Sequence, residues 1–322
     1  MPIQIISTGS FLPKLVVSND DLSKFLDTSD EWITTRSGIK TRHIATNETT
    51  SSLGAEAAKI ALKKSKLTPK DIDLVICATI SADTSIPMVA ANIKKELQIE
   101  NAATFDISAI CSGFVYAITI ADSMMRASGY KNALVIGSDT NSQILDWKDR
   151  STCVLFGDGA GAVVLSNTEK RGIISTYLNC IIDSEEILSC NNKLDPTPFS
   201  DSSRLENIKV RMNGSKTMRF AVKSLNEAIE AVLKKAGVSI DDIKMIVPHQ
   251  ANSRILQYAA KDLGIDISKF YINIDKTGNT SSATIPIALD EMIGKKLVSR
   301  GDLIIFVAFG GGLTSGAVLA EW

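Results

Sequence analysis

Short apolar runs and longer stretches with helical spacing alternate along the chain. Buried strands are predicted at 103–107, 245–247 and 270–274, because these runs are short, apolar and bounded by polar turns. From Phe114 onward, apolar side chains recur three and four positions apart until Gly129, which predicts a helix that ends at that glycine. Strands that alternate with helices are typical of an α/β protein.

Two segments of the chain resemble each other. LKKSKLTPKDIDLVI begins at Leu62, and LKKAGVSIDDIKMIV begins 171 residues later at Leu233. Each is typical of a helix end, a short turn and an apolar strand. A second pair, FGDGAGAVVL and FGGGLTSGAVL, has a glycine turn before a closing strand. The repeat predicts two related halves, 1–166 and 167–322, in a pseudo-twofold α/β architecture with a site where they meet.

One uncharged stretch needs a separate test for membrane insertion. Residues 303–320 carry no charge, and about 18 apolar residues are the lower limit for a spanning helix. Four glycines interrupt this stretch, so two strands joined by a glycine turn are predicted instead. The segment from Met1 to Pro13 lacks the basic stretch and the small-residue cleavage site of a signal peptide, which favours a first strand.

The composition is that of an ordinary globular protein, with 322 residues, 44% of them hydrophobic and 22% charged. The 35 Lys and Arg residues nearly balance the 36 Asp and Glu residues, which argues against a protein that binds duplex nucleic acid. Five cysteines without a CxxC pair favour a reduced, cytoplasmic chain with no zinc site.

Cys111 lies between a predicted strand and a predicted helix, at or near the helix N-terminus. The helix dipole and the free N–H groups at such a position lower the pKa of a cysteine and favour the nucleophilic thiolate. Most free cysteines are instead small buried hydrophobic residues. Cys77 and Cys153, flanked by apolar strand residues, are assigned to that class, whereas both interpretations stay open for Cys111.

Asn279 and His249 occupy comparable places in the second half. Asn279 lies in DKTGNTSSAT, between a predicted strand and a predicted helix. His249 lies in PHQAN directly after a strand, where α/β sheets carry functional residues. The other histidine, His43, lies among cationic residues in KTRHI and is better explained as a surface or structural residue. If Cys111 has a histidine as base or proton donor, we therefore expect it to be His249.

The glycine pattern GxGxG at 157–161 raises the question of a nucleotide site. The residues after it, Ala162 to Leu165, form a predicted strand, whereas a dinucleotide site needs a helix whose N-terminus holds the pyrophosphate. The sequence contains neither a GxxxxGKS/T loop nor a GxSxG elbow. P-loop enzymes and α/β-hydrolases are therefore disfavoured.

Three blocks around the candidate residues resemble a known family. FDISAICSGF, PHQANSRI and TGNTSSATIP are similar to the catalytic blocks of β-ketoacyl-acyl carrier protein synthase III, a thiolase-fold condensing enzyme that starts bacterial fatty-acid synthesis. TSDEWITTRSGI, FGDGAGA and FGGGLTSGA also match, in order and over essentially the whole chain. The resemblance implies a thiolase-like fold of two αβαβα halves with mixed sheets and an active site at their junction.

The resemblance implies a role for each candidate residue. Cys111 takes the primer acyl group from coenzyme A as a thioester. His249 and Asn279 hold the thioester carbonyl of malonyl-acyl carrier protein while carbon dioxide leaves, and the resulting enolate attacks the acyl-cysteine. The backbone N–H groups of Cys111 and Gly311 form the oxyanion hole for that attack. No metal and no cofactor are implied beyond the coenzyme A thioester, which is a substrate.

The resemblance also implies residues that bind coenzyme A. Trp32 and Arg36 match the family pair that sandwiches the adenine, although a Trp and an Arg four residues apart are more often a helix-surface pair. The other coenzyme A residues that the resemblance implies are Thr28, Arg150, Gly214 and Asn252. Acyl-coenzyme A is therefore an expected partner of the chain.

Three cations match positions at which the family meets its acidic carrier protein: Arg219, Arg254 and Lys261. Each one alone is more often a solvated surface charge, and Asp262 stands where a second cation is common. Association that weakens with salt is the expected signature of such a patch. A homodimer is implied by the resemblance alone, and neither nucleic acid nor a membrane is an expected partner.

Two positions depart from the family pattern near the acyl pocket. Ile86 and Met218 stand where aromatic side chains are common, and Met88 lies close to Ile86. Smaller or more flexible side chains predict a pocket that is not strictly acetyl-sized, although one such side chain decides only about 1–3 kcal/mol. Residues 181–207, which are polar and acidic, form a predicted tunnel-covering loop that is longer than usual.

Two alternatives to fatty-acid initiation stay open. One is an acyltransferase or ketosynthase of secondary metabolism that uses the same triad with a different or longer primer. The other is a non-catalytic thiolase-fold partner subunit, although the complete set of Cys111, His249 and Asn279 argues against it. A thiolase is disfavoured because that family needs a second cysteine late in the chain, and none follows Cys190.

Overall fold

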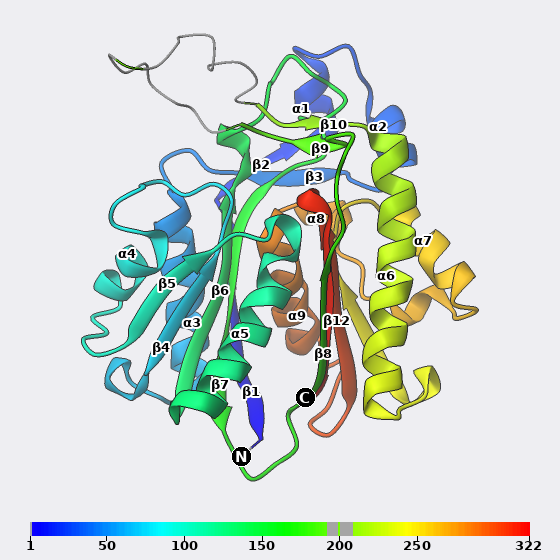
Figure 1. The fold of residues 1–322 in the computed structure, drawn as a ribbon. Helices are drawn as coiled ribbons and strands as arrows, with labels where there is room; N and C mark the ends of the chain where they lie inside the picture. Colours follow the sequence, from blue (N-terminus) through cyan, green and yellow to red (C-terminus); the bar gives the residue numbers. More distant parts are fainter. Residues whose placement is uncertain (1, 192–198, 200–208) are drawn as a thin grey trace.

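Two mixed β-sheets form the framework of the molecule (Figure 1). The computed structural model describes residues 2–191, 199 and 209–322. The first sheet contains, in spatial order, β1 (Ile3–Phe11), β7 (Asp158–Asn167), β6 (Asn132–Thr140), β4 (Leu74–Ala78) and β5 (Ala103–Ile107). The second contains β11 (Ile243–Pro248), β12 (Leu303–Gly310), β13 (Thr314–Glu321) and β8 (Ile173–Cys180). Each sheet combines parallel and antiparallel pairs, as predicted.

The segments that repeat in sequence occupy equivalent places in the two sheets. α3 (Thr50–Ser65) leads through a 3-10 turn into β4, and α6 (Gly214–Ala236) leads through a 3-10 turn into β11. The uncharged stretch at 303–320 forms the antiparallel pair β12 and β13, which confirms the two predicted strands. In the part of the chain that the structure describes, no helix is long and apolar enough to cross a membrane. The boundary after residue 166 stays a prediction.

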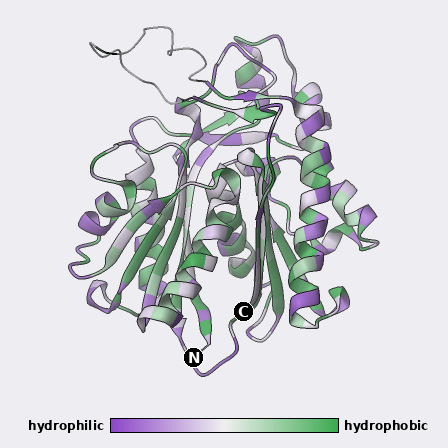
Figure 2. Cartoon of the chain, in the orientation of Figure 1, coloured by the Kyte–Doolittle hydropathy of each residue, from purple (hydrophilic) through white to green (hydrophobic). Residues whose placement is uncertain are grey.

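Two helices lie between the sheets, and further helices cover the outer faces (Figure 1). The inner pair is α5 (Gly113–Ser128) and α9 (Thr284–Gly294). Strand β4 shows how alternation builds these layers, because Leu74 and Ile76 join the inner core whereas Val75 and Cys77 face the outer one. Figure 2 shows the resulting hydrophobic strands and the two-sided helices around them.

Two outer layers complete the five-layer arrangement. α3 and α4 (Val89–Glu96) pack on the first sheet, and α6 and α7 (Ser253–Asp262) pack on the second. The inner core joins both halves, since Phe114 of α5, Leu289 of α9 and Phe306 of β12 belong to one buried cluster. Burial of this kind contributes about 25 cal/mol per Å² of apolar surface, so the junction of the sheets is also a main source of stability.

Smaller elements cover one end of the two sheets. They are β2 (Leu15–Ser18), α1 (Asn19–Ser23), α2 (Asp30–Ser37), β3 (Thr41–Ile44), β9 (Leu188–Ser189), β10 (Arg211–Met212) and α8 (Ile274–Thr277). β9 pairs with β10 across a segment whose middle is outside the described residues. The predicted tunnel-covering loop at 181–207 therefore lies only in part within the structure.

The prediction of a strand at 270–274 is wrong. Phe270 forms only an isolated parallel bridge with Ile246, and the chain turns into α8 at Ile274. Tyr271 donates its N–H to the Ile246 carbonyl, but its own carbonyl accepts the side-chain amide of Gln250 at 3.0 Å. A side chain thus takes the place of a second ladder bond and ends the pairing.

The two halves approach each other closely where β6 meets the segment before α9. A Cβ on Gly137 would lie 2.4 Å from the Ser282 carbonyl oxygen and 2.9 Å from the Ser282 carbonyl carbon. No real Cβ occupies such a position, and backbone atoms are not free to swing aside as a flexible side chain is. The glycine therefore permits the contact that brings the second half onto the first.

We predict that Gly137→Ala destabilises the protein by about 1–3 kcal/mol, because an added methyl group overpacks this contact. Urea denaturation of the variant and the wild type measures the change. Gly294→Ala is the matched control, since a Cβ there meets nothing within 4 Å. The control should be neutral or slightly stabilised. Equal urea midpoints for Gly137→Ala and the wild type would contradict the prediction, because the backbone at this contact would then move aside at little cost.

Candidate active site

Cys111 lies where the sequence predicted, between β5 and α5. It belongs to a 3-10 turn, Ile110–Ser112, that leads directly into α5 at Gly113. Ile110 has φ +51°, in the left-handed region, which a branched side chain rarely adopts. This strained turn places a thiol that is only 6% exposed at the start of a helix that runs between the two sheets.

The glycine turn after β12 closes against the Cys111 backbone. A Cβ on Gly310 would lie 2.9 Å from the Cys111 nitrogen and 3.2 Å from the Ser112 nitrogen. The Thr314 hydroxyl donates to the Ala109 carbonyl at 3.0 Å and fixes the same turn from the other side. Gly311, the predicted oxyanion-hole partner of Cys111, follows directly and lies under Leu188 of β9. The glycine turn therefore packs against the Cys111 backbone, and the pairing of the Cys111 and Gly311 N–H groups in an oxyanion hole stays a prediction.

Burial dominates the acidity of the Cys111 thiol. It raises the pKa of Cys111 to about 12, and the negative charge of Asp139 contributes in the same direction. The neighbouring Ser281 hydroxyl offsets only part of this rise. The predicted lowering of the Cys111 pKa is therefore wrong, because desolvation outweighs the helix N-terminus. The thiol, and not the thiolate, is the resting form at neutral pH.

His249 lies directly after β11, as predicted, and its backbone N–H donates to the Val307 carbonyl at 2.8 Å. Its imidazole is buried, and this burial lowers the pKa of His249 to about 3. The Phe309 ring packs edge-on to the imidazole, with the centroids 5.2 Å apart. His249 is consequently a neutral imidazole in a fixed position, with one nitrogen that donates a hydrogen bond and one that accepts, and it does not act as a cation.

Asn279 lies in the loop between α8 and α9. Its backbone N–H donates to the Leu155 carbonyl at 2.9 Å, and its carbonyl accepts the Gly157 N–H at 3.0 Å. Its side-chain oxygen accepts the Ser281 N–H at 2.8 Å, which leaves the Nδ2 group as the available donor. The loop thus presents one oriented amide N–H pair.

Ser281 connects the three predicted catalytic residues. Its N–H holds Asn279, and its hydroxyl lies near Cys111. Its carbonyl accepts the N–H of Thr284, the partner of His249, and lies 3.0 Å from the Thr284 hydroxyl oxygen. Ser281 has φ +52°, a second strained position opposite Ile110. The structure therefore brings the triad together through one turn, whereas its catalytic roles stay a prediction.

Asp139 is a site residue that sequence reasoning missed. Its buried carboxylate accepts hydrogen bonds from the Thr79 and Ser81 hydroxyls, the Ile80 N–H, and both the N–H and the hydroxyl of Ser282. The polar end of the otherwise apolar strand β6, GSDT, was the signal that pointed to it. Asp139 anchors the Asn279 loop of the second half to the first half.

A cavity of about 430 Å³ is lined by residues of α2, α6, the start of α7 and the segment 151–155. Of the predicted coenzyme A residues, it is lined by Trp32, Arg36, Gly214 and Asn252. Leu155, whose carbonyl accepts the Asn279 N–H, also lines it. Met218 is a further lining residue. One wall of the cavity is therefore hydrogen-bonded to the backbone of a triad residue.

Two arginines stack on the Trp32 ring. The Arg36 guanidinium lies 4.6 Å from the ring centroid, and the Arg150 guanidinium lies 5.2 Å from it. Arg150 is also ion-paired with the Asp27 carboxylate at 3.1 Å. Thr28 follows Asp27 but is not among the residues that line the cavity. Trp32, Arg36 and Arg150 thus form one cluster, and Thr28 lies at its edge.

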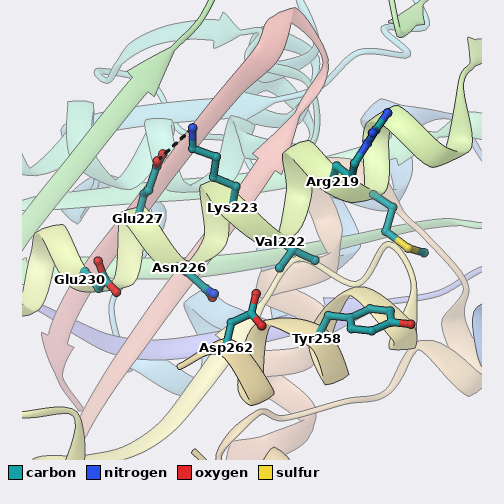
Figure 3. Close-up of a pocket in the computed structure, with 9 residues that line it drawn as sticks. Arg219, Val222, Lys223, Asn226, Glu227, Glu230, Tyr258 and Asp262 are labelled. Carbon is teal, nitrogen blue, oxygen red and sulfur yellow. Dashed lines mark ion pairs between the residues drawn. The ribbon is translucent and has the colours of Figure 1, made fainter. Parts of the chain in front are cut away.

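Of the predicted carrier-protein residues, Arg219 lies on α6, and Arg254 and Lys261 lie at opposite ends of α7. Arg219 of α6 and Asp262 of α7 line a groove of about 580 Å³ between the two helices (Figure 3). Arg254 lines the cavity mouth, and Lys261 is exposed near the end of α7. Within the described ranges no ion pair involves Arg219, Arg254 or Lys261.

The predicted acyl-pocket residues Ile86 and Met88 lie on the surface of the single chain. Ile86 is 92% exposed and Met88 is 39% exposed, in the loop before α4. The Asp106 carboxylate of β5 accepts the Val89 and Ala90 N–H groups and so fixes this loop against the edge of the first sheet. No cluster that could hold a metal ion occurs among the described residues.

Comparison with known proteins places the chain in a family. A family model described as 3-Oxoacyl-[acyl-carrier-protein (ACP)] synthase III matches residues 105–180, and the model of its C-terminal part matches residues 233–322. The chain is 50% identical over 320 residues to Beta-ketoacyl-[acyl-carrier-protein] synthase III of Clostridium beijerinckii. This alignment covers 99% of each of the two chains. The chain belongs to the 3-oxoacyl-[acyl-carrier-protein] synthase III family.

Solved structures agree with this membership. The chain superposes on 3-oxoacyl-[acyl-carrier-protein] synthase III of Aquifex aeolicus with a TM-score of 0.93 and 46% identity, over 99% of this chain and 100% of that one. It also resembles the priming β-ketosynthase of the R1128 polyketide pathway, with a TM-score of 0.91 and 31% identity, over 99% and 96% of the two chains. The protein is therefore an acyltransferase-type condensing enzyme with a thiolase-like fold.

We predict that iodoacetamide alkylates Cys111 slowly at neutral pH and that the rate rises about tenfold per pH unit from pH 7 to 9. Well below its pKa, a thiol gains thiolate by that factor per unit. Peptide mass spectrometry measures the reaction, with the exposed Cys180 in the same sample as a faster reference. A fast rate at Cys111 that does not change with pH would show that its thiolate is already present.

Proposed function

We propose that the protein condenses an acyl-coenzyme A primer with malonyl-acyl carrier protein, with loss of carbon dioxide, and so initiates fatty-acid synthesis. The observation that carries this proposal is the cavity lined by Trp32, Arg36 and Leu155, because the Leu155 carbonyl also accepts the N–H of the triad residue Asn279. We propose that a thioester on a long flexible arm keeps its headgroup at Trp32 and Arg36 while its acyl end reaches the buried Cys111 thiol. Membership of the synthase III family supports the same reaction.

In the first step the Cys111 sulfur attacks the primer thioester. A new sulfur–acyl bond forms on Cys111, the bond from the acyl group to coenzyme A breaks, and the cysteine proton ends on the coenzyme A thiol. Because burial raises the pKa of Cys111 to about 12, this proton leaves as substrate binds and not before. The backbone amides of Cys111 and Gly311 stabilise the charge on the acyl oxygen.

In the second step His249 and Asn279 hold the carbonyl oxygen of the malonyl thioester. Cleavage of the carboxyl–carbon bond releases carbon dioxide and leaves the electron pair as an enolate, whose oxygen the two donors stabilise. The enolate carbon then attacks the acyl-cysteine, the sulfur–acyl bond breaks, and Cys111 leaves as the thiolate, which takes one proton from solvent to return to the thiol. A neutral His249 suits this role, because burial lowers its pKa to about 3 and the ring never needs to ionise.

A ketosynthase that primes a polyketide is the second candidate function. The resemblance to the R1128 priming β-ketosynthase favours it, at 31% identity over nearly the whole chain. The two functions share the chemistry and differ in the primer. We propose that the primer is selected by Met218 at the cavity and by Ile86 and Met88 in the surface loop. A primer panel separates the two functions.

We also propose that the protein works as a homodimer in the cytoplasm. β5 is the edge strand of the first sheet, and all five of its residues are only half-buried in the single chain. The exposed Ile86 and Met88 lie beside the same edge. A second copy would cover this edge and bring Ile86 toward a neighbouring acyl pocket. The five free cysteines are in keeping with a reducing compartment.

We predict that the wild type forms an acyl adduct on Cys111 with acetyl-, isobutyryl- or octanoyl-coenzyme A, and that Cys111→Ala forms none. His249→Ala and Asn279→Ala should still load the primer but should lose about 100- to 1000-fold in malonyl decarboxylation, because each removes an oxyanion donor. Intact-protein mass spectrometry measures loading, and release of carbon dioxide measures decarboxylation. An unmodified Cys111 with every primer would reject the proposed function.

We propose that the carrier protein docks on the surface formed by Arg219, Arg254 and Lys261. Figure 3 shows Arg219 at one end of the α6–α7 groove and Glu230 and Asp262 farther along it. Lys223 is paired with Glu227 at 3.7 Å and is therefore partly neutralised. The net positive charge is thus concentrated at the end of the groove beside the cavity mouth. An acidic partner is attracted to that end, which is where its thioester arm must enter.

We predict that Arg219→Glu lowers kcat/KM for malonyl-acyl carrier protein about tenfold at low salt, through a slower association. The difference should shrink in high salt because exposed charges are screened. Asp262→Lys, which supplies the missing cation, should raise the same constant. Lys70→Glu, an exposed charge in the turn before β4, is the control. Equal losses for Arg219→Glu and Lys70→Glu would contradict this docking surface.

A further inference from the structure

The His249 imidazole has one polar neighbour that the mechanism above does not use. Its Nδ1 lies 2.7 Å from the hydroxyl oxygen of Thr284, the first residue of α9. The same hydroxyl lies 3.0 Å from the Ser281 carbonyl oxygen. All of these groups are buried. A hydroxyl has one hydrogen, so its direction decides which nitrogen of His249 carries the proton.

The two distances favour a hydroxyl hydrogen that points at His249. Hydroxyl donors bond at about 2.7–2.8 Å and N–H donors at about 2.9–3.0 Å. The 2.7 Å contact between Thr284 and Nδ1 fits a hydroxyl donor, whereas the 3.0 Å contact with the Ser281 carbonyl is long for one. That carbonyl already accepts the Thr284 backbone N–H, so it does not need the hydroxyl.

We propose that Thr284 is a positioning residue that donates its hydroxyl hydrogen to Nδ1 and so fixes His249 as the tautomer protonated on Nε2. Among the described residues, no hydrogen-bond partner of Nε2 is found. The proton on Nε2 is thereby left for the substrate. Only the identity of that acceptor, the malonyl thioester oxygen, rests on the proposed function.

The opposite tautomer would change what the site can do. With the proton on Nδ1, the imidazole would donate to Thr284, and Nε2 would present a lone pair toward the substrate. Two lone pairs repel, so His249 would then oppose the developing enolate oxygen, and Asn279 alone would stabilise it. Because burial keeps the ring neutral, no second proton compensates. The hydroxyl of Thr284 therefore selects between a donor and an acceptor at the same position.

The chain offers an internal reference for a direct test. His43 has its Nδ1 2.6 Å from the Pro13 carbonyl oxygen, which only accepts, so the Nδ1 of His43 bears a proton. His43 and His249 are the only histidines of the sequence. A two-bond ¹H–¹⁵N correlation spectrum of ¹⁵N-histidine-labelled protein at neutral pH should therefore show His249 protonated on Nε2 alone and His43 with a proton on Nδ1. H43Q assigns the signals.

The variants T284V and T284S link the tautomer to the reaction. T284V keeps the shape but removes the hydroxyl, so the His249 signals should move toward a mixture and malonyl decarboxylation should fall about tenfold or more. T284S keeps the hydroxyl and should retain both the wild-type tautomer and most of the activity. A urea midpoint for each variant separates loss of the tautomer from loss of stability.

Two outcomes would overturn the proposal. One is a wild-type spectrum in which His249 carries its proton on Nδ1, a result that requires no variant to fold. The other is a folded T284V with the wild-type spectrum and wild-type decarboxylation. Loading of Cys111 by acetyl-coenzyme A is measured in parallel, and its absence in the wild type would reject the proposed function. The NMR spectrum of His249 is recorded without substrate, so it tests the role of Thr284 even if Cys111 is not loaded.

Discussion

The active site depends on one buried carboxylate at the contact between the halves. Asp139 accepts five hydrogen bonds, three from the segment after β4 and two from Ser282 of the second half. Five donors require an ionised acceptor, even though burial raises the pKa of Asp139. Each buried donor left unsatisfied costs about 1–3 kcal/mol. The turn with Asn279, Ser281 and Thr284 therefore keeps its geometry only while Asp139 holds Ser282.

The pseudo-twofold relation explains how one scaffold supplies two kinds of chemistry. In the first half the turn before α5 carries Cys111, and in the second half the turn before α9 is preceded by Asn279. Because α5 and α9 lie side by side between the sheets (Figure 1), the two turns meet at the same end. His249 enters from the end of β11, which matches β4 in the first sheet. The nucleophile and the donors thus come from equivalent places in the two halves.

Sequence patterns predicted the framework better than the fine structure of the site. Local features of the sequence, namely hydrophobic periodicity and the positions of turn residues, were enough to predict the repeat and the glycine turns. The same features predicted the positions of Cys111 and His249. The strand at 270–274 was wrong because the Gln250 side chain, twenty residues away, replaces a ladder bond. The direction of the Cys111 pKa shift was wrong because burial is a property of the packed molecule. Asp139 was missed for the same reason, since its partners come from distant segments.

The stack at Trp32 has a consequence for the release of coenzyme A under the proposed function. The Trp32 ring is covered by the Arg36 and Arg150 guanidiniums, and the Asp27 carboxylate pairs with Arg150. An adenine that enters this stack would replace these contacts, so its net gain would be a difference between two stacks. Coenzyme A would then be held more weakly than by a bare Trp32 ring, and it would leave sooner once it has delivered its acyl group.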